Sequence, residues 1–270
     1  MTLNDYLDSP LGRAAPTSVT GNTPWAVGYQ AEITDIIRRY TAHRPRSLQV
    51  HLGPSELGVE CDRQVVGKLL GLPPTNHVTD PWPSFMGTAG HAAMEDVMKW
   101  DNAQRYPAAP RWFTERRVIP HPEHAGTADL YDVQGVLGDY KFLGDASMDK
   151  VKSPAGPPRK YQAQLGMYGL GYIREGYQVD RVALIAFPRT GSSLAGTFVW
   201  EKPFVELLPL LEEVWADTKR RKDIVRLIQG GVGSIEDVPK AELDTECYFC
   251  PFYRPYGQTG VGCTGPRSPV

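Results

Sequence analysis

The sequence predicts an α/β fold in which a mixed central sheet is flanked by helices. Three observations predict it. The chain has 270 residues, which is enough to bury a sizeable core. Its composition, 41% hydrophobic and 22% charged, is that of a globular protein. Helical periodicity and short apolar runs typical of strands alternate in the order helix, three strands, helix, two strands, helix.

The charge balance excludes a protein that is basic overall. Lysine and arginine number 29 against 31 aspartate and glutamate residues, so the net charge is −2 and contact with nucleic acid requires a local basic patch. The mean hydropathy is −0.35, and the sequence contains no apolar run long enough to span a membrane. The N-terminus lacks a basic segment followed by an apolar one. We therefore expect a cytoplasmic protein, in the host cytoplasm if a phage encodes it.

The chain is predicted to have three parts: an N-terminal arm with a short helix (1–46), a core (47–246) and a C-terminal cysteine segment (247–270). Periodicity and proline and glycine punctuation predict helices. They span Gln30–Thr41, Pro54–Leu69, Thr88–Trp100, Tyr161–Glu175 and Phe204–Gln229.

Period-two alternation predicts the strands, and a hairpin is expected at Gln134-Gly135. The proline-, glycine- and lysine-rich stretch Asp145–Lys160 is predicted to be a loop. The predicted strands are Trp112–Ile119, Thr127–Val133, Val136–Phe142, Arg181–Phe187 and Thr197–Lys202.

Two acidic motifs lie on the predicted hairpin: Gly126-x-x-Asp129 and Asp139-x-Lys141. Residues two apart in a strand share a face, so Asp139 and Lys141 are expected to point the same way, with Asp129 on the neighbouring strand. Two carboxylates beside a lysine suit Mg²⁺ or Mn²⁺, and the lysine can orient or deprotonate an attacking water. The alternative is an exposed strand face with one ion pair.

Two polar motifs on predicted helices accompany these strands. His91 lies on a helix of small residues, where a structural hydrogen bond is the alternative to metal binding. Gln164 and Tyr168 are four apart on a later helix and therefore share a face, which is otherwise a solvated one.

The ordered set of His91, Gly126-x-x-Asp129, Asp139-x-Lys141 and Gln164-x-x-x-Tyr168 resembles the PD-(D/E)xK nuclease superfamily, and within it the RecB-type and CRISPR-associated Cas-four exonucleases. The resemblance runs from about Gly53 to Cys263. It implies a restriction-endonuclease-like core and a catalytic Lys141. The implied metal ligands are His91, Asp129, Asp139 and the backbone carbonyl of Tyr140, while Gln164 and Tyr168 would position the lysine or contact DNA. Many relatives have glutamate where this chain has Asp139.

The four cysteines form a second candidate site. Cys247-x-x-Cys250 has metal-ligand spacing, Cys263 follows, and Cys61 lies far upstream. Such a set suits zinc or an iron–sulfur cluster, and spacing leaves both open beside unligated thiols. The resemblance implies a [4Fe–4S] cluster with zinc as the alternative, although the gap before Cys263 is longer than in most relatives. We expect this centre to fasten the two ends of the core.

A basic stretch after Lys141 is expected to contact DNA phosphates without reading bases; it contains Lys150, Lys152, Arg159 and Lys160. The run Lys219-Arg-Arg-Lys222 is interpreted as a solvated helix face. The resemblance implies a metal-dependent exonuclease on single-stranded DNA or DNA ends, in recombination, repair, CRISPR adaptation or phage DNA processing. The alternatives are a non-catalytic DNA-end-binding subunit with a structural iron–sulfur cluster, and a structural metal protein.

Overall fold

The computed structural model describes residues 23–43, 52–76, 80–241, 247, 249–254 and 262–265. The chain divides into two units, Met1–Leu48 and Gln49–Val270. In the first unit, helix α2 (Pro24–Ala42) begins earlier than predicted because the Thr23 hydroxyl caps it and Pro24 occupies its first position. The rest of the predicted arm lies outside the described residues.

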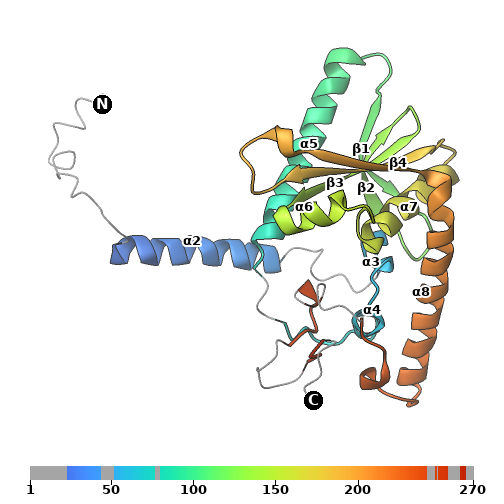
Figure 1. Cartoon of the computed structure of the whole chain (residues 1–270). Coiled ribbons are helices and arrows are strands. Elements are labelled where there is room, and N and C mark those ends of the chain that lie inside the picture. The colour runs from blue at the N-terminus through green and yellow to red at the C-terminus, as the bar shows by residue number, and fades with distance from the viewer. Residues whose placement is uncertain are drawn as a thin grey trace. The chain divides into compact units, whose positions relative to one another are not determined.

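The second unit is built on one five-stranded sheet with the order β1-β2-β3-β4-β5 (Figure 1). Strands β3 and β4 are parallel and the other neighbours are antiparallel, so the predicted mixed sheet is confirmed. The β2–β3 hairpin turns at Gly135, whose φ of 85° suits glycine. The strands are β1 (Trp112–Val118), β2 (Gly126–Asp132), β3 (Val136–Leu143), β4 (Arg181–Pro188) and β5 (Phe198–Pro203).

Helices flank this sheet, as predicted. Helix α5 (Trp82–Arg105) contacts β1 and β3, and α7 (Arg159–Arg174) contacts every strand from β1 to β4. The crossover from β3 to the parallel β4 runs through α6 (Asp145–Lys152) and α7, and α8 (Leu208–Gln229) packs on α7 and α4. In the part of the chain that the structure describes, no helix is both long and apolar enough to cross a membrane. The remaining elements are α3 (Pro54–Leu57), α4 (Asp62–Leu69), η2 (Leu194–Gly196), η3 (Phe204–Leu207) and η4 (Ile235–Asp237).

Two predictions about secondary structure were wrong. The predicted helix Pro54–Leu69 is two helices, α3 and α4, separated by a loop that begins at Gly58. This loop passes so close to α7 that a Cβ on Gly58 would lie 2.6 Å from the Cβ of Ala163. The predicted loop Asp145–Lys160 contains α6, which buries Met148 and Val151 against the core.

The main core lies between α7 and the sheet. Its fully buried members include Leu137 of β3, Leu165 and Tyr172 of α7 and Leu184 of β4. Burial of side chains of this size contributes about 1.5–3 kcal/mol each. The core fixes α7 against β2 and β3, the two strands that contain the predicted acidic motifs.

Candidate active site

Asp129 lies where strands β2 and β3 stop pairing. The ladder ends at Leu130↔Gly138, and one further step of this register would place Asp129 opposite Asp139. Instead of a ladder bond, Asp129 Oδ2 accepts a hydrogen bond of 2.7 Å from the Tyr140 N–H. The hairpin thus brings together the two acidic motifs that the sequence placed on neighbouring strands.

His91 reaches this carboxylate from α5. Its Nδ1 lies 3.3 Å from Asp129 Oδ1, and its ring contacts the rings of Tyr140 and Phe142. The close approach is possible because the preceding residue is Gly90, where a Cβ would lie 2.4 Å from the Phe142 ring. Burial lowers the pKa of His91, but the hydrogen bond and charge of Asp129 outweigh it and raise the pKa above its usual value.

Glu115 of β1 joins this cluster, and sequence reasoning missed it. Its Oε1 lies 4.0 Å from His91 Nδ1, and ligand atoms of Glu115, His91 and Asp129 all lie within 4.8 Å of one another. Among the described residues, Glu115 is the single non-glycine with positive φ, at 47°. The pairing of β1 with β2 omits Glu115, although the register on either side of it would place it opposite Asp129. Strained backbone of this kind concentrates at functional sites.

Asp139 and Lys141 share a face of β3, as their spacing predicted, and form a largely buried ion pair there. The Asp139 side chain is 1% exposed, and neither carboxylate oxygen accepts a hydrogen bond of good geometry within the described structure. Burial raises the pKa of Asp139, and the charge of Lys141 opposes that shift only in part. Burial also disfavours the Lys141 ammonium, but attraction to Asp139 and Asp129 raises its pKa. Its Nζ lies 5.2 Å from the centre of the Tyr161 ring.

This donor set fits a hard divalent cation. Glu115 and Asp129 offer carboxylate oxygens and His91 offers a ring nitrogen, all within 4.8 Å of one another, and the Asp139 carboxylate follows on the neighbouring strand. Lys141 contacts Asp139 Oδ2, whereas the buried Oδ1 has no hydrogen-bond partner in the described structure and therefore needs a further source of positive charge. A divalent cation supplies that charge and selects oxygen ligands of this kind.

Gln164 and Tyr168 lie together on α7, as their four-residue spacing predicted. Gln164 Nε2 donates a 3.4 Å hydrogen bond to the Tyr168 hydroxyl, and the two residues are 6% and 2% exposed. The Tyr168 ring lies beside Gly126, where a Cβ would approach it to 2.8 Å. The pair therefore supports the strand that contains Asp129 rather than presenting an exposed surface.

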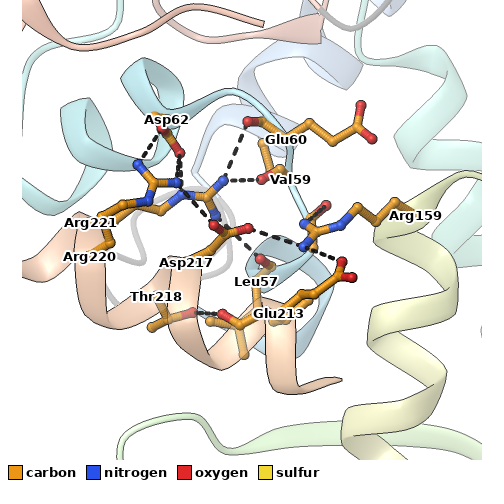
Figure 2. Close-up of polar contacts among 12 residues, drawn as sticks. Leu57, Val59, Glu60, Asp62, Arg159, Glu213, Asp217, Thr218, Arg220 and Arg221 are labelled. Atoms are coloured by element: carbon orange, nitrogen blue, oxygen red, sulfur yellow. Dashed lines mark hydrogen bonds and ion pairs between the residues drawn. The ribbon is translucent and has the colours of Figure 1, made fainter. Parts of the chain in front are cut away.

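The basic residues expected to contact DNA occupy three different environments. Lys150 and Lys152 are exposed in the last turn of α6, and Lys160 Nζ lies 5.5 Å from the centre of the Tyr161 ring. Arg159 instead turns to α8, where it pairs with Asp217 at 3.0 Å and Glu213 at 3.8 Å (Figure 2). Three of the four predicted contacts thus remain candidates for phosphate binding, and Arg159 is engaged by carboxylates.

The basic run Lys219–Lys222 on α8 was predicted to be a solvated helix face, and this prediction was wrong because Arg221 is 1% exposed. Its guanidinium donates to Asp62 at 2.7 Å and to the carbonyls of Leu57 and Val59 at 3.4 and 2.6 Å (Figure 2). Arg220 also pairs with Asp62, at 2.6 Å. Arg221 of α8 thus satisfies backbone carbonyls at the end of α3 and in the loop that leads to α4.

All four cysteines line one pocket at the end of this loop. Cys61 occupies the N-cap position of α4 without a side-chain capping hydrogen bond, and the Cys263 N–H donates to the Phe252 carbonyl at 2.8 Å. The Phe252 ring packs on α4, where a Cβ on Gly67 would approach it to 3.1 Å. Burial, together with the charges of the other three cysteines, raises the pKa of the Cys250 thiol to about 12. No disulfide joins these cysteines in the described part of the chain, and four cysteine sulfurs are the donor set of a tetrahedral metal site.

No family model matches the chain, and no curated protein is similar to it. Similar solved structures include the crystal structure of an alkaline exonuclease (LHK-Exo) from Laribacter hongkongensis, with 9% identity and a TM-score of 0.44 over 67% of this chain and 93% of that chain. The same exonuclease in complex with dAMP gives 11% identity and a TM-score of 0.45 with the same coverage. The crystal structure of SSO0001 gives 16% identity and a TM-score of 0.45, over 86% of this chain and 100% of that chain. Likeness at this level does not assign an activity to this chain.

Proposed function

We propose that the protein is a divalent-metal-dependent nuclease that hydrolyses DNA phosphodiester bonds, as an exonuclease on single-stranded DNA or DNA ends. One observation carries the proposal. The Asp139 carboxylate is buried, lacks a hydrogen bond of good geometry, and pairs with Lys141 beside the His91, Glu115 and Asp129 cluster. Burying the Asp129 and Asp139 carboxylates together with Lys141 costs free energy, and buried ionisable clusters of this kind concentrate at functional sites.

Each residue has a distinct task in this proposal. Asp129, Asp139, His91, Glu115 and the backbone carbonyl of Tyr140 would hold Mg²⁺ or Mn²⁺, which activates water and polarises the phosphate. Lys141, held as an ammonium by its carboxylate neighbours, would orient the attacking water and offset negative charge on the transition state. Gln164 and Tyr168 would hold the β2 strand, and through it Asp129, in place.

The exposed lysines of α6 and Lys160 would bind the DNA backbone. These lysines lie on α6 and at the start of α7, the two helices that follow β3 in the chain. Lys141 is on β3, so the proposed phosphate contacts come directly after the proposed site in the sequence. Contacts to phosphates position a strand without selecting its sequence, which suits an enzyme that acts on ends.

The test is degradation of end-labelled linear single-stranded DNA with Mn²⁺ or Mg²⁺, beside a circular substrate. We expect Lys141→Ala to lower the rate on the order of 10²–10⁴-fold while DNA binding persists. Lys99→Ala is the matched control, because Lys99 is 61% exposed on α5 and pairs only with Glu95 among the ion pairs of the described chain. Cutting of circular DNA would make the enzyme an endonuclease. Full-length protein that binds DNA but cuts neither substrate would favour the alternative, a non-catalytic DNA-end-binding subunit.

The cysteine pocket supports a second part of the proposal, a [4Fe–4S] cluster bound by Cys61, Cys247, Cys250 and Cys263. Such a cluster would fasten α4 to the C-terminal segment. Elemental analysis and visible absorption test it. Iron, sulfide and a brown chromophore that Cys61→Ser and Cys263→Ser both remove would support the cluster. Zinc lost in the same variants would establish the alternative metal. Folded protein with neither metal would refute a metal centre.

A further inference from the structure

The β1–β2 connection contains a third group of metal-ligand residues, separate from the candidate active site and from the cysteines. His121, Glu123 and His124 each offer a ligand atom, and these atoms all lie within 4.8 Å of one another. A turn in which the His124 N–H donates to the His121 carbonyl at 2.9 Å brings the two rings together, with 5.5 Å between their centres.

His124 has the burial and the hydrogen bonding that are usual for a histidine that binds a metal. It is 3% exposed, and its Nδ1 lies 2.9 Å from the carbonyl oxygen of Leu52. A carbonyl only accepts, so the proton is on Nδ1 and the lone pair is on Nε2. That Nε2 is buried and has no hydrogen-bond partner in the described structure. Histidines that bind metals through one nitrogen usually donate from the other to a carbonyl or carboxylate in this way.

Helix α8 closes one side of the group. The Trp215 ring contacts both imidazoles, with centre-to-centre distances of 5.2 Å to His121 and 5.8 Å to His124. Lys222 Nζ lies 2.7 Å from Glu123 Oε2, so the carboxylate is already turned toward a cation. The charge of Lys222 opposes a second cation at the same carboxylate.

We propose that His121, Glu123 and His124 bind a divalent transition metal of the Zn²⁺ class, with water in the fourth position. Two imidazole nitrogens and one carboxylate oxygen suit Zn²⁺, whereas Mg²⁺ and Ca²⁺ select oxygen ligands. A bound ion would tie the β1–β2 connection together through ligands held by Leu52 on one side and α8 on the other.

Zn²⁺ binding to the full-length protein tests the proposal, measured as Zn²⁺ per chain after dialysis against buffered Zn²⁺. We expect the wild type to bind one more ion than His121→Gln, and Glu123→Gln to bind that ion roughly tenfold or more weakly. His43→Gln, on the C-terminal end of α2, is the matched control and should bind as the wild type. These exposed or half-exposed positions avoid changing the buried His124.

Lys222→Gln separates metal binding from a merely structural ion pair. Glu123→Gln and Lys222→Gln break the same pair, so a structural effect would move both in the same direction. For a metal site they move in opposite directions, because removing Lys222 removes a competing charge and tightens Zn²⁺ binding. Ni²⁺ bound at this site should quench tryptophan fluorescence from Trp215. If Trp215→Phe abolishes that quenching, the ion lies beside this ring. Equal Zn²⁺ content in wild type and His121→Gln, or parallel changes in the two charge variants, would overturn the proposal.

Discussion

The Asp62 carboxylate accepts a 2.7 Å hydrogen bond from Arg221 Nε, although the two residues are 159 positions apart in the chain. Arg221 also satisfies carbonyls of the loop that ends at Cys61 (Figure 2). This arrangement couples the first helices of the core to its last one, and it makes the stability of the cysteine pocket depend on α8.

Replacing Arg221 with lysine should therefore destabilise the fold strongly. Lysine cannot donate to Asp62 and to two carbonyls at once, and breaking a buried pair costs about 3–5 kcal/mol. Arg220→Lys is the control, because the Arg220 side chain is 47% exposed and should cost about 1 kcal/mol or less. Chemical unfolding of both variants measures the difference. Equal losses would show that burial of Arg221 does not determine its contribution.

The same pair should make stability depend on acid pH. Burial tends to raise the pKa of Asp62, but hydrogen bonds from Arg220 and Arg221 outweigh it and lower the pKa below its usual value. The stabilisation is then fully present above the unfolded pKa of about 3.9, and it is lost as the pH falls through the folded pKa. Asp62→Asn should be less stable than the wild type at pH 7, and the gap should close in acid. A gap that stays constant with pH would contradict this assignment.

Two glycines of α5 should respond oppositely to alanine. A Cβ on Gly90 would lie 2.4 Å from the Phe142 ring, so Gly90→Ala should cost about 1–3 kcal/mol and displace His91. Gly87 has open space at that position, so Gly87→Ala should stabilise the helix by about 0.5–1 kcal/mol. Melting temperatures and nuclease rates of the two variants check this. A Gly90→Ala protein as active and stable as Gly87→Ala would show that α5 can shift without cost.

Glu115→Gln should weaken metal binding more than DNA binding. The change removes one charge from the cluster of His91, Glu115 and Asp129. The Mg²⁺ or Mn²⁺ concentration for half-maximal activity should rise roughly tenfold or more, while the KM for DNA changes little. Glu206→Gln, on the exposed side of η3, is the control. An unchanged metal requirement would remove Glu115 from the proposed site.

The alternation of residues along the strands predicted the part of the site that lies on the β2–β3 hairpin. Asp139 and Lys141 share a face because strands have a period of two, and the turn at Gln134-Gly135 sets the register that brings Asp129 close. Glu115 could not be found this way, because its place in the cluster depends on a positive φ and on a helix from another part of the chain.

Tertiary contacts also account for the predictions that were wrong. The residues of α6 resemble a loop in composition, but the helix forms because Met148 and Val151 are buried by neighbouring elements. Lys219–Lys222 resembles a solvated run, yet Arg221 is buried because a loop far away in sequence needs its donors. No local pattern specifies such a partner.

The shared pocket of the four cysteines has a consequence for biosynthesis. Cys61 leaves the ribosome well before Cys247, and at roughly 5–20 residues per second on the order of ten seconds or more pass between them. During that time all five strands of the sheet are translated, and the Cys61 thiol is without the other three cysteines of its pocket. The pocket closes only on a chain whose translation has passed Cys263, so an ion bound by all four cysteines would distinguish chains that include this residue from shorter ones.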